Sequence, residues 1–152
     1  MSSTIGFYGG VGSVTGSNFM LDSGEVAILV DCGLVQGDKF AQEINAEPFE
    51  YDPSQVDFLF VTHAHADHIG RIPKLVRDGF RGKIYSTRPT RELARIMFDD
   101  ALHIMEYEAK RDDRKPLYSQ NDIDLALSLW KTAEYHETIN LPDDITAEFK
   151  NA

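Results

Sequence analysis

The chain has 152 residues, enough for one domain with a substantial hydrophobic core and too few for two domains of ordinary size. Apolar residues make up 42% of it and aromatic residues 11%, which excludes a disordered chain. The formal net charge of −10 argues against a general affinity for nucleic acid, because phosphate neutralisation requires an excess of Lys and Arg.

The N-terminal third predicts short strands joined by turns that contain glycine. Residues 5–8 form a brief apolar strand, and the glycine-rich residues 9–16 follow as a loop. Residues 18–21 and 26–31 flank a hairpin-type connection that contains Gly24. The loop lacks the Lys of a phosphate-binding loop, so a sharp turn between strands is the favoured interpretation.

The remainder predicts strands that alternate with helices. Residues 58–61 and 84–86 have the apolar character of strands, and residues 69–76 and 89–111 have helical periodicity. A capping box at residues 119–122 predicts a third long helix through Trp130, and residues 134–139 and 145–149 resemble strands. This order predicts an α/β fold with mixed α+β layers, in which helices cover at least one face of a sheet.

Cys32 is the only cysteine, so no intrachain disulfide can form, which fits a reducing cytoplasm. The chain starts without a signal-peptide pattern, and no apolar run approaches the roughly 20 residues that span a bilayer. We therefore expect a cytoplasmic protein without a membrane partner.

Residues 62–68 carry the chain's strongest chemical signal. Three of the five histidines, His63, His65 and His68, occur here together with Asp67. Neutral imidazole and carboxylate are the ligands that zinc and similar divalent metals prefer. The run therefore predicts a metal site, in preference to a core histidine or a helix N-cap at Asp67.

The spacing of these ligands does not suit one regular element. On a strand His68 would point away from the others, and on a helix residues two apart do not face each other. We expect a loop at the end of a strand that runs into a helix near Asp67. Four ligands exceed what one tetrahedral ion takes from so short a span, so two ions with a bridging hydroxide are the better model. The residues alone indicate hydrolysis and not its substrate.

The sequence resembles the β-CASP branch of the metallo-β-lactamase superfamily, whose members include metal-dependent nucleases that process RNA. The resemblance rests on the His-x-His-x-Asp-His run and on four flanking motifs: Val14-Thr15-Gly16-Ser17, Asp31-Cys32-Gly33 with Gln36-Gly37, the extension from Asp67 to Leu75, and Ile84-Tyr85-Ser86-Thr87. It covers essentially the whole chain and implies the first half of an αββα sandwich.

The resemblance also implies roles for individual residues. His63 and His65 would bind one zinc ion, and Asp67 and His68 a second. Asp31 matches an aspartate that orients the ligand loop, a sensible role because a ligating imidazole needs its other N–H held. Asp67 would also hold the attacking hydroxide, which makes it the expected catalytic residue. RNA is the implied substrate.

The chain departs from the family pattern after this loop. The family's later histidine motif, bridging aspartate and C-terminal histidine have no match, and neither His103 nor His136 has a suitable context. We therefore expect residues 1–152 to be the N-terminal part of a metallo-β-lactamase-like domain, inactive alone and belonging to a longer nuclease. Apolar sheet faces left open would favour self-association into a homo-oligomer.

Two other functions fit parts of the pattern. A thioester or lactam hydrolase of the same superfamily would use the same ligands on a small molecule. A non-catalytic metal-binding or scaffold protein would retain only half a site. A local basic group that includes Arg71, Lys74 and Arg77 has two interpretations, a track for RNA phosphates or a solvated helix face.

Overall fold

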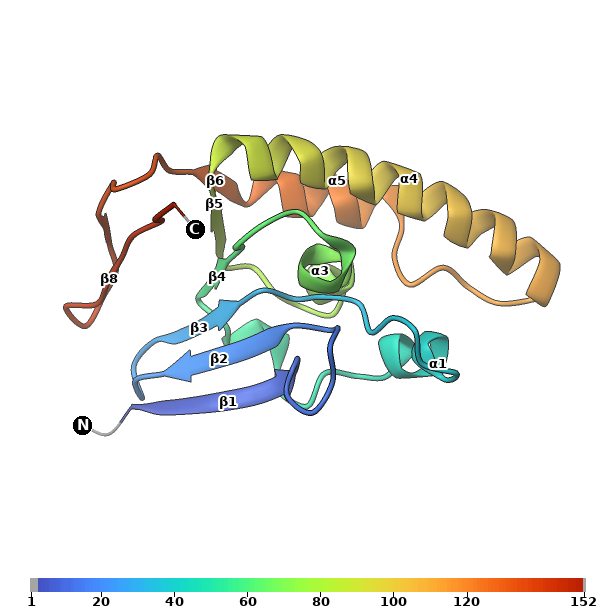
Figure 1. Ribbon diagram of the computed structural model, residues 1–152, viewed down its shortest axis with the longest axis horizontal. Coiled ribbons are helices and arrows are strands. Elements are labelled where there is room, and N and C mark those ends of the chain that lie inside the picture. Colours follow the sequence, from blue (N-terminus) through green and yellow to red (C-terminus); the bar gives the residue numbers. More distant parts are fainter. Residues whose placement is uncertain (1–2, 152) are drawn as a thin grey trace.

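The computed structural model describes residues 3–151 (Figure 1). The strands in this range are β1 (Thr4–Gly9), β2 (Asn18–Asp22), β3 (Ala27–Val30), β4 (Phe58–Phe60), β5 (Lys83–Ser86), β6 (Trp130–Thr132), β7 (Ile139–Asn140) and β8 (Thr146–Ala147). The helices are α1 (Ala41–Ala46), the short 3-10 helix η1 (Pro53–Gln55), α2 (Ala66–Ile69), α3 (Ile72–Arg77), α4 (Arg88–Asp112) and α5 (Gln120–Ser128).

Six strands form one sheet in the order β1-β2-β3-β4-β5-β6. The first three are antiparallel neighbours, as expected for strands joined by short turns, whereas β3, β4, β5 and β6 run parallel. The carboxyl ends of the four parallel strands therefore lie at the same edge of the sheet. In open α/β sheets this edge is where ligands bind.

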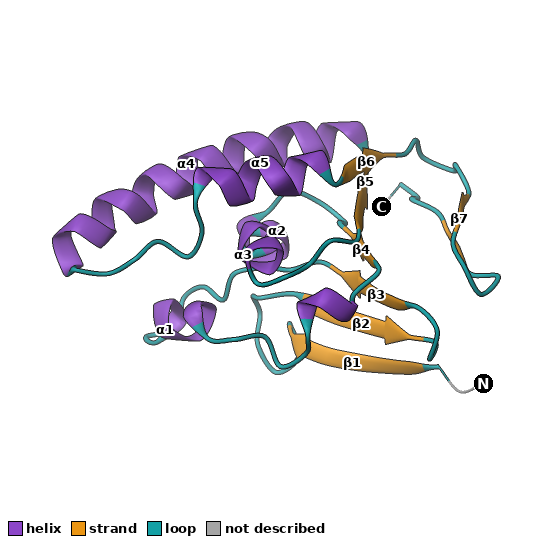
Figure 2. Ribbon diagram, turned by 180° about the vertical axis from the view of Figure 1, so that it is seen from behind, coloured by secondary structure: helices purple, strands orange, loops and turns teal. Residues whose placement is uncertain are grey.

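The two faces of the sheet are covered differently. On one face Leu29, Leu59 and Ile84 are fully buried against α3, α4 and α5, which form a helical layer (Figure 2). On the other face Ile28 and Phe60 pack against a smaller cluster supplied by residues after β6, including the β7–β8 hairpin. Continuously apolar strands such as β3 and β4 fit this placement, because a strand with both faces covered cannot alternate with polar residues.

The helix expected over residues 69–76 is divided into two. α2 ends at Ile69, and α3 begins at Ile72 with Pro73 in its first turn. A proline is tolerated there because the N–H it lacks would have no partner inside the helix. The break turns α2 into a separate short helix that carries Asp67 and His68.

The other expected elements occur with changed boundaries. The long helix α4 and the capping box at Ser119 are confirmed. The third helix ends at Ser128, and Trp130 instead begins a strand, β6, that the helical pattern concealed. Two of the expected strands shorten to the two-residue strands β7 and β8. His136, inside the first expected strand, has a left-handed backbone conformation that a regular strand does not allow, and Asp143 and Asp144, also left-handed, lie in the turn between β7 and β8.

Among the described residues, no helix combines the length and the apolarity that crossing a membrane requires.

Candidate metal centre

The four expected ligands lie where strand β4 ends. Residues 61–65 leave the strand as a loop, and α2 begins at Ala66, so His65 stands at the N-cap of the helix. Asp67 is in the first turn of α2, where the helix dipole favours a carboxylate. The expected arrangement of a loop running into a helix near Asp67 is therefore confirmed.

The backbone that follows β3 holds this loop in place. The amide of Cys32 donates to the carbonyl of His68 (2.8 Å), and the amide of Leu34 donates to the carbonyl of Ala66 (2.9 Å). Between them Gly33 packs so closely that a Cβ atom there would lie 1.6 Å from the carbonyl oxygen of Asp67. Only glycine permits this approach, so Gly33 sets the distance between the two segments.

The carboxylate of Asp31 lies behind the ligand loop and is 2% exposed. Its Oδ1 accepts from the Thr62 amide (2.8 Å), and its Oδ2 accepts from the Thr62 hydroxyl (2.8 Å). The same Oδ2 lies 2.7 Å from Nδ1 of His68. Asp31 reaches all three atoms from a left-handed backbone conformation (φ 60°), which aspartate tolerates better than most residues.

These contacts determine which ring nitrogens are available to a metal. A carboxylate can only accept, so Nδ1 of His68 donates to Asp31, and Nε2 keeps its lone pair. The Thr62 hydroxyl gives its proton to Asp31, so it accepts from Nδ1 of His63 (3.0 Å). Nε2 of His63 is then also a free donor atom for a metal.

The three imidazoles gather on one side of the loop. The ring centroids of His63 and His65 are 4.6 Å apart, and those of His63 and His68 are 4.0 Å apart. Oδ2 of Asp67 lies 3.6 Å from Nε2 of His68. Within residues 3–151 no three His, Cys, Asp or Glu side chains are arranged to hold one metal ion. The donor types fit zinc, and the number of donors fits partial coordination, with two protein ligands for each of two ions. The ligand roles stay a prediction.

Local electrostatics favours the neutral form of His63. Burial, followed by the neighbouring His68 and His65, lowers the pKa of His63 below its usual value of 6.5. A neutral imidazole is the form that binds a metal. By contrast, burial raises the pKa of the Cys32 thiol to about 11, so Cys32 is a packing residue.

Two basic residues at α3 face the interior, Arg71 at its N-cap and Lys74 within it, whereas Arg77 is exposed. Arg71 is 7% exposed and donates to the Gly33 carbonyl, and Lys74 is 1% exposed and lies over the ring of Phe49. Lys74 also pairs with Asp78 at 2.7 Å. The phosphate-track interpretation is wrong for Arg71 and Lys74, because their charges are already satisfied inside the protein.

The two remaining histidines lie away from this site. His103 is exposed on α4. His136 is also exposed, and its ring contacts Glu148 (3.0 Å).

Sequence reasoning identified Asp31 but assigned no supporting role to Thr62 or Ser17. Thr62 is not distinctive in sequence, and its role depends on Asp31, which is 31 positions away. Ser17 contributes its amide to the Asp67 carbonyl (2.9 Å) and its hydroxyl to Asp31 (3.4 Å). The available signal was the place of Ser17 in the Val14-Thr15-Gly16-Ser17 motif at the end of the glycine-rich loop.

Comparison with known proteins identifies a family and several relatives similar to this chain. A family model described as the metallo-beta-lactamase superfamily matches residues 11–138. Ribonuclease TTHA0252 of Thermus thermophilus is 40% identical over 134 residues, which are 88% of this chain and 29% of the relative. The transcription termination factor FttA of Methanosarcina mazei is 33% identical over 149 residues, which are 95% of this chain and 22% of the relative.

The fold similarity extends to a solved structure. The subclass B3 metallo-beta-lactamase MEM-A1, isolated from a soil metagenome library, superimposes with a TM-score of 0.50 at 18% identity, covering 85% of this chain and 44% of the other. This likeness concerns the fold alone. The family match over residues 11–138 establishes that the chain belongs to the metallo-beta-lactamase superfamily.

Proposed function

We propose that this chain is the N-terminal part of a zinc-dependent RNA phosphodiesterase of the β-CASP branch. The observation that carries the proposal is the constraint on His63 and His68, whose Nδ1 atoms are engaged by Thr62 and Asp31 so that both Nε2 atoms are available to a metal. The relatives support a longer protein, because the chain spans 29% of the ribonuclease and 22% of the termination factor.

Two zinc ions held at this edge would supply Lewis acidity and a lowered pKa for an attacking water. His63 and His65 would hold one ion, and Asp67 and His68 the other. The Asp67 carboxylate, in the first turn of α2, would also accept a hydrogen bond from the attacking water and orient it toward phosphorus. Asp31 stays behind the ring of His68 and fixes its orientation.

RNA is favoured as the substrate by the names of the relatives. One is called a ribonuclease and another a transcription termination factor. The solved lactamase, at 18% identity, supports the fold and gives no weight to a lactam substrate. A thioester or lactam hydrolase therefore has no specific observation in its favour.

The test compares two histidine variants of the full-length protein. His65→Ala removes a proposed ligand, whereas His103→Ala removes an exposed imidazole on α4 and serves as the matched control. Zinc content and cleavage of an end-labelled single-stranded RNA are measured for both. We expect His65→Ala to lose zinc and cleavage together and His103→Ala to retain both. Intact cleavage in a folded His65→Ala protein would overturn the proposal.

A further inference from the structure

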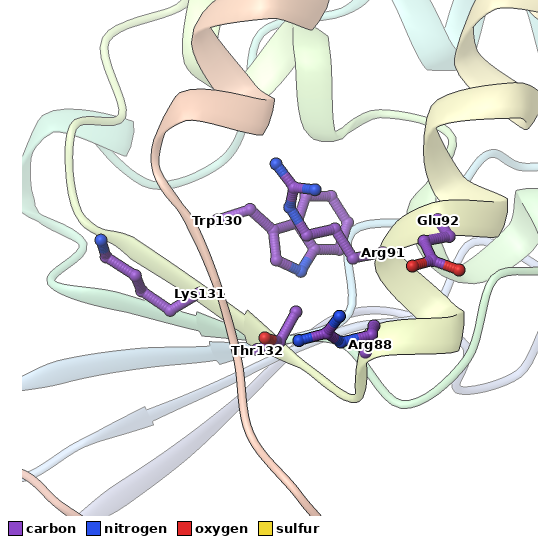
Figure 3. A pocket seen from close by; sticks show the side chains of 6 residues that line it. All are labelled: Arg88, Arg91, Glu92, Trp130, Lys131 and Thr132. Atoms are coloured by element: carbon purple, nitrogen blue, oxygen red, sulfur yellow. The ribbon is translucent and has the colours of Figure 1, made fainter.

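A second site lies along the same edge of the sheet. A pocket of about 430 Å³ is lined by Arg88, Arg91, Glu92, Trp130, Lys131 and Thr132 (Figure 3). Arg88 and Arg91 come from the first turn of α4, and the last three residues form β6. None of these residues belongs to the candidate metal centre.

The sheet register places this pocket beside the metal centre. Phe60 of β4 pairs with Tyr85 of β5, and Ser86 of β5 pairs with Thr132 of β6. The loop after β4 carries the ligands, and the ends of β5 and β6 carry the pocket. Strands are about 4.8 Å apart, so β6 lies roughly 10 Å from the strand that leads to His63. One short stretch of an extended chain can therefore contact both sites.

The charge of the pocket suits an anion. Three cations, Arg88, Arg91 and Lys131, line the pocket with one carboxylate, Glu92, in a chain whose net charge is −10. Figure 3 shows the Lys131 ammonium directed away from the two guanidinium groups. In Figure 3 the Glu92 carboxylate is set apart from both guanidinium groups, and the Arg88 side chain extends toward Thr132. Among residues 3–151, neither Arg88 nor Lys131 takes part in an ion pair.

The remaining polar groups support the same interpretation. Arg91 donates to the carbonyl of Leu127 (3.2 Å), which orients it from behind. Thr87, at the N-cap of α4, makes no capping hydrogen bond, and its hydroxyl lies 3.0 Å from that of Thr90 instead. The start of α4 thus adds the partial positive charge of a helix N-terminus, although Pro89 has no N–H and the Arg91 amide donates to the Thr87 carbonyl (3.2 Å). The Trp130 indole N–H is already bonded to Ser86 (2.8 Å), so the polar recognition comes from the cations.

We propose that this pocket binds a backbone phosphate of single-stranded RNA, a few nucleotides at most from the phosphate held at the metal centre. The inference rests on the proposed function, because it is the RNA substrate that would span the two sites. Arg and Lys contacts to phosphate position a nucleic acid without reading its sequence. The pocket therefore sets where the strand lies and leaves base preference unchanged.

The test removes two charges from the pocket and, in a control, two charges from elsewhere. Arg88→Gln with Lys131→Gln alters exposed side chains that have no structural hydrogen bond in the described part of the chain. Arg95→Gln with Lys110→Gln changes the net charge equally on exposed positions of α4 outside the pocket. Affinity for a fluorescent single-stranded RNA is measured by anisotropy with the full-length protein at several salt concentrations.

We expect the pocket variant to bind RNA on the order of tenfold more weakly than the control. The slope of log affinity against log salt should fall in magnitude by about 0.7, the contribution of one phosphate contact on a single strand. The loss should be the same for RNAs of different sequence. Affinity and slope equal to those of the control would overturn the inference. So would a pocket variant that binds inorganic phosphate more weakly than the control but binds RNA equally well.

The two proposals fail in different ways. RNA binding is also measured in proteins that carry His65→Ala, because binding through the pocket does not require cleavage. A protein that binds RNA through the pocket but never cleaves it contradicts the proposed function and leaves the pocket supported. A protein that cleaves RNA with unchanged affinity in the pocket variant contradicts the pocket alone.

Discussion

Nδ1 of His68 lies 2.7 Å from Oδ2 of Asp31, although the two residues are 37 positions apart. Asp31 follows β3 and His68 lies in α2, so the contact joins the end of one parallel strand to the loop that follows the next. It orients the imidazole and leaves Nε2 free on the side where Asp67 lies. A metal ligand that is held through its other nitrogen is ready to bind without reorientation.

Asp31→Asn tests this contact. The amide keeps the size of the side chain but replaces one acceptor oxygen with a donor, so His68 loses the partner that fixes its tautomer. We expect metal affinity to fall by about 10- to 100-fold, measured by competition with a chromophoric chelator. Asp100→Asn, an exposed change on α4, should leave affinity unchanged. Equal affinities in the two variants would show that Asp31 does not position His68.

Thr62 connects Asp31 to a second histidine. Its hydroxyl donates to Asp31 (2.8 Å) and accepts from His63 (3.0 Å). Thr62→Val keeps the shape and removes the hydroxyl, so we expect weaker metal binding by about tenfold. Thr62→Ser keeps the hydroxyl and should bind nearly as well as wild type. Nitrogen-15 NMR of the histidine rings should report a changed tautomer of His63 in the valine variant only. Identical spectra of the valine and serine variants would contradict the connection from Asp31 through Thr62 to His63.

Gly33→Ala should damage both stability and the site. The added Cβ would meet the backbone carbonyl of Asp67, which cannot move without displacing the ligand loop. We expect a loss of at least about 3 kcal/mol in the free energy of unfolding, with metal binding lost in any folded fraction. Gly12→Ala is the comparison, because its φ is 70° but a Cβ there meets nothing within 4 Å. It should cost about 1 kcal/mol from backbone strain alone.

The ion pair between buried Lys74 and half-buried Asp78 predicts a pH dependence of stability. Burial raises the pKa of Asp78, but the hydrogen bonds and charges of Lys74 and Arg77 outweigh it and hold the pKa below 3.8. A carboxyl with a lowered pKa stabilises the folded state fully above its unfolded value and loses that contribution as pH falls through the folded value. Asp78→Asn should therefore destabilise at pH 7 by about 2 kcal/mol, a discounted value because solvent reaches the carboxylate.

Urea unfolding at several pH values checks this prediction. The difference between wild type and Asp78→Asn should begin to shrink below about pH 4, near the unfolded value, and disappear as pH falls through the lowered pKa of the folded carboxyl. Asp112→Asn, which alters an exposed pair with Arg111, should have no measurable effect. A constant difference between wild type and Asp78→Asn down to pH 2 would contradict the assignment.

Apolar side chains on β1 predict that the 152-residue chain associates with itself. Ile5 is 63% exposed and Phe7 is 61% exposed, and Phe7 lies edge-on to Phe19 with ring centroids 5.8 Å apart. Exposed apolar patches drive association. We expect light scattering to detect oligomers that Phe7→Lys reduces, whereas Tyr107→Lys on α4 does not. A monodisperse wild-type monomer would contradict this expectation.

The ligand loop and most of the sheet could be predicted from the sequence, because both depend on local patterns. The histidine spacing and the apolar runs of β3, β4 and β5 are readable within a few residues. The strand β6 was missed because Trp130 continues the apolar period of α5, and only pairing with β5 turns it into a strand. Propensity is overridden there by a tertiary contact.

The support of the site could be predicted only in part, because it depends on contacts between distant segments. Asp31 was found through the resemblance, whereas Thr62 and Gly33 act through the Asp31 carboxylate and the Asp67 carbonyl. The sequence also does not predict that the side chains of Arg71 and Lys74 point into the protein. A solvated basic helix face and a buried ion pair contain the same residue types. Only the folded structure shows that Asp78 lies beside Lys74.

Metal removal tests the central claim, that the loop from His63 to His68 holds the metals for RNA cleavage. The full-length protein is stripped with a chelator, and its zinc content and its cleavage of a labelled RNA are followed as zinc is returned. The account predicts that cleavage disappears with the metal, returns in proportion to bound zinc, and does not return in His65→Ala. Undiminished cleavage by the fully stripped protein would contradict it.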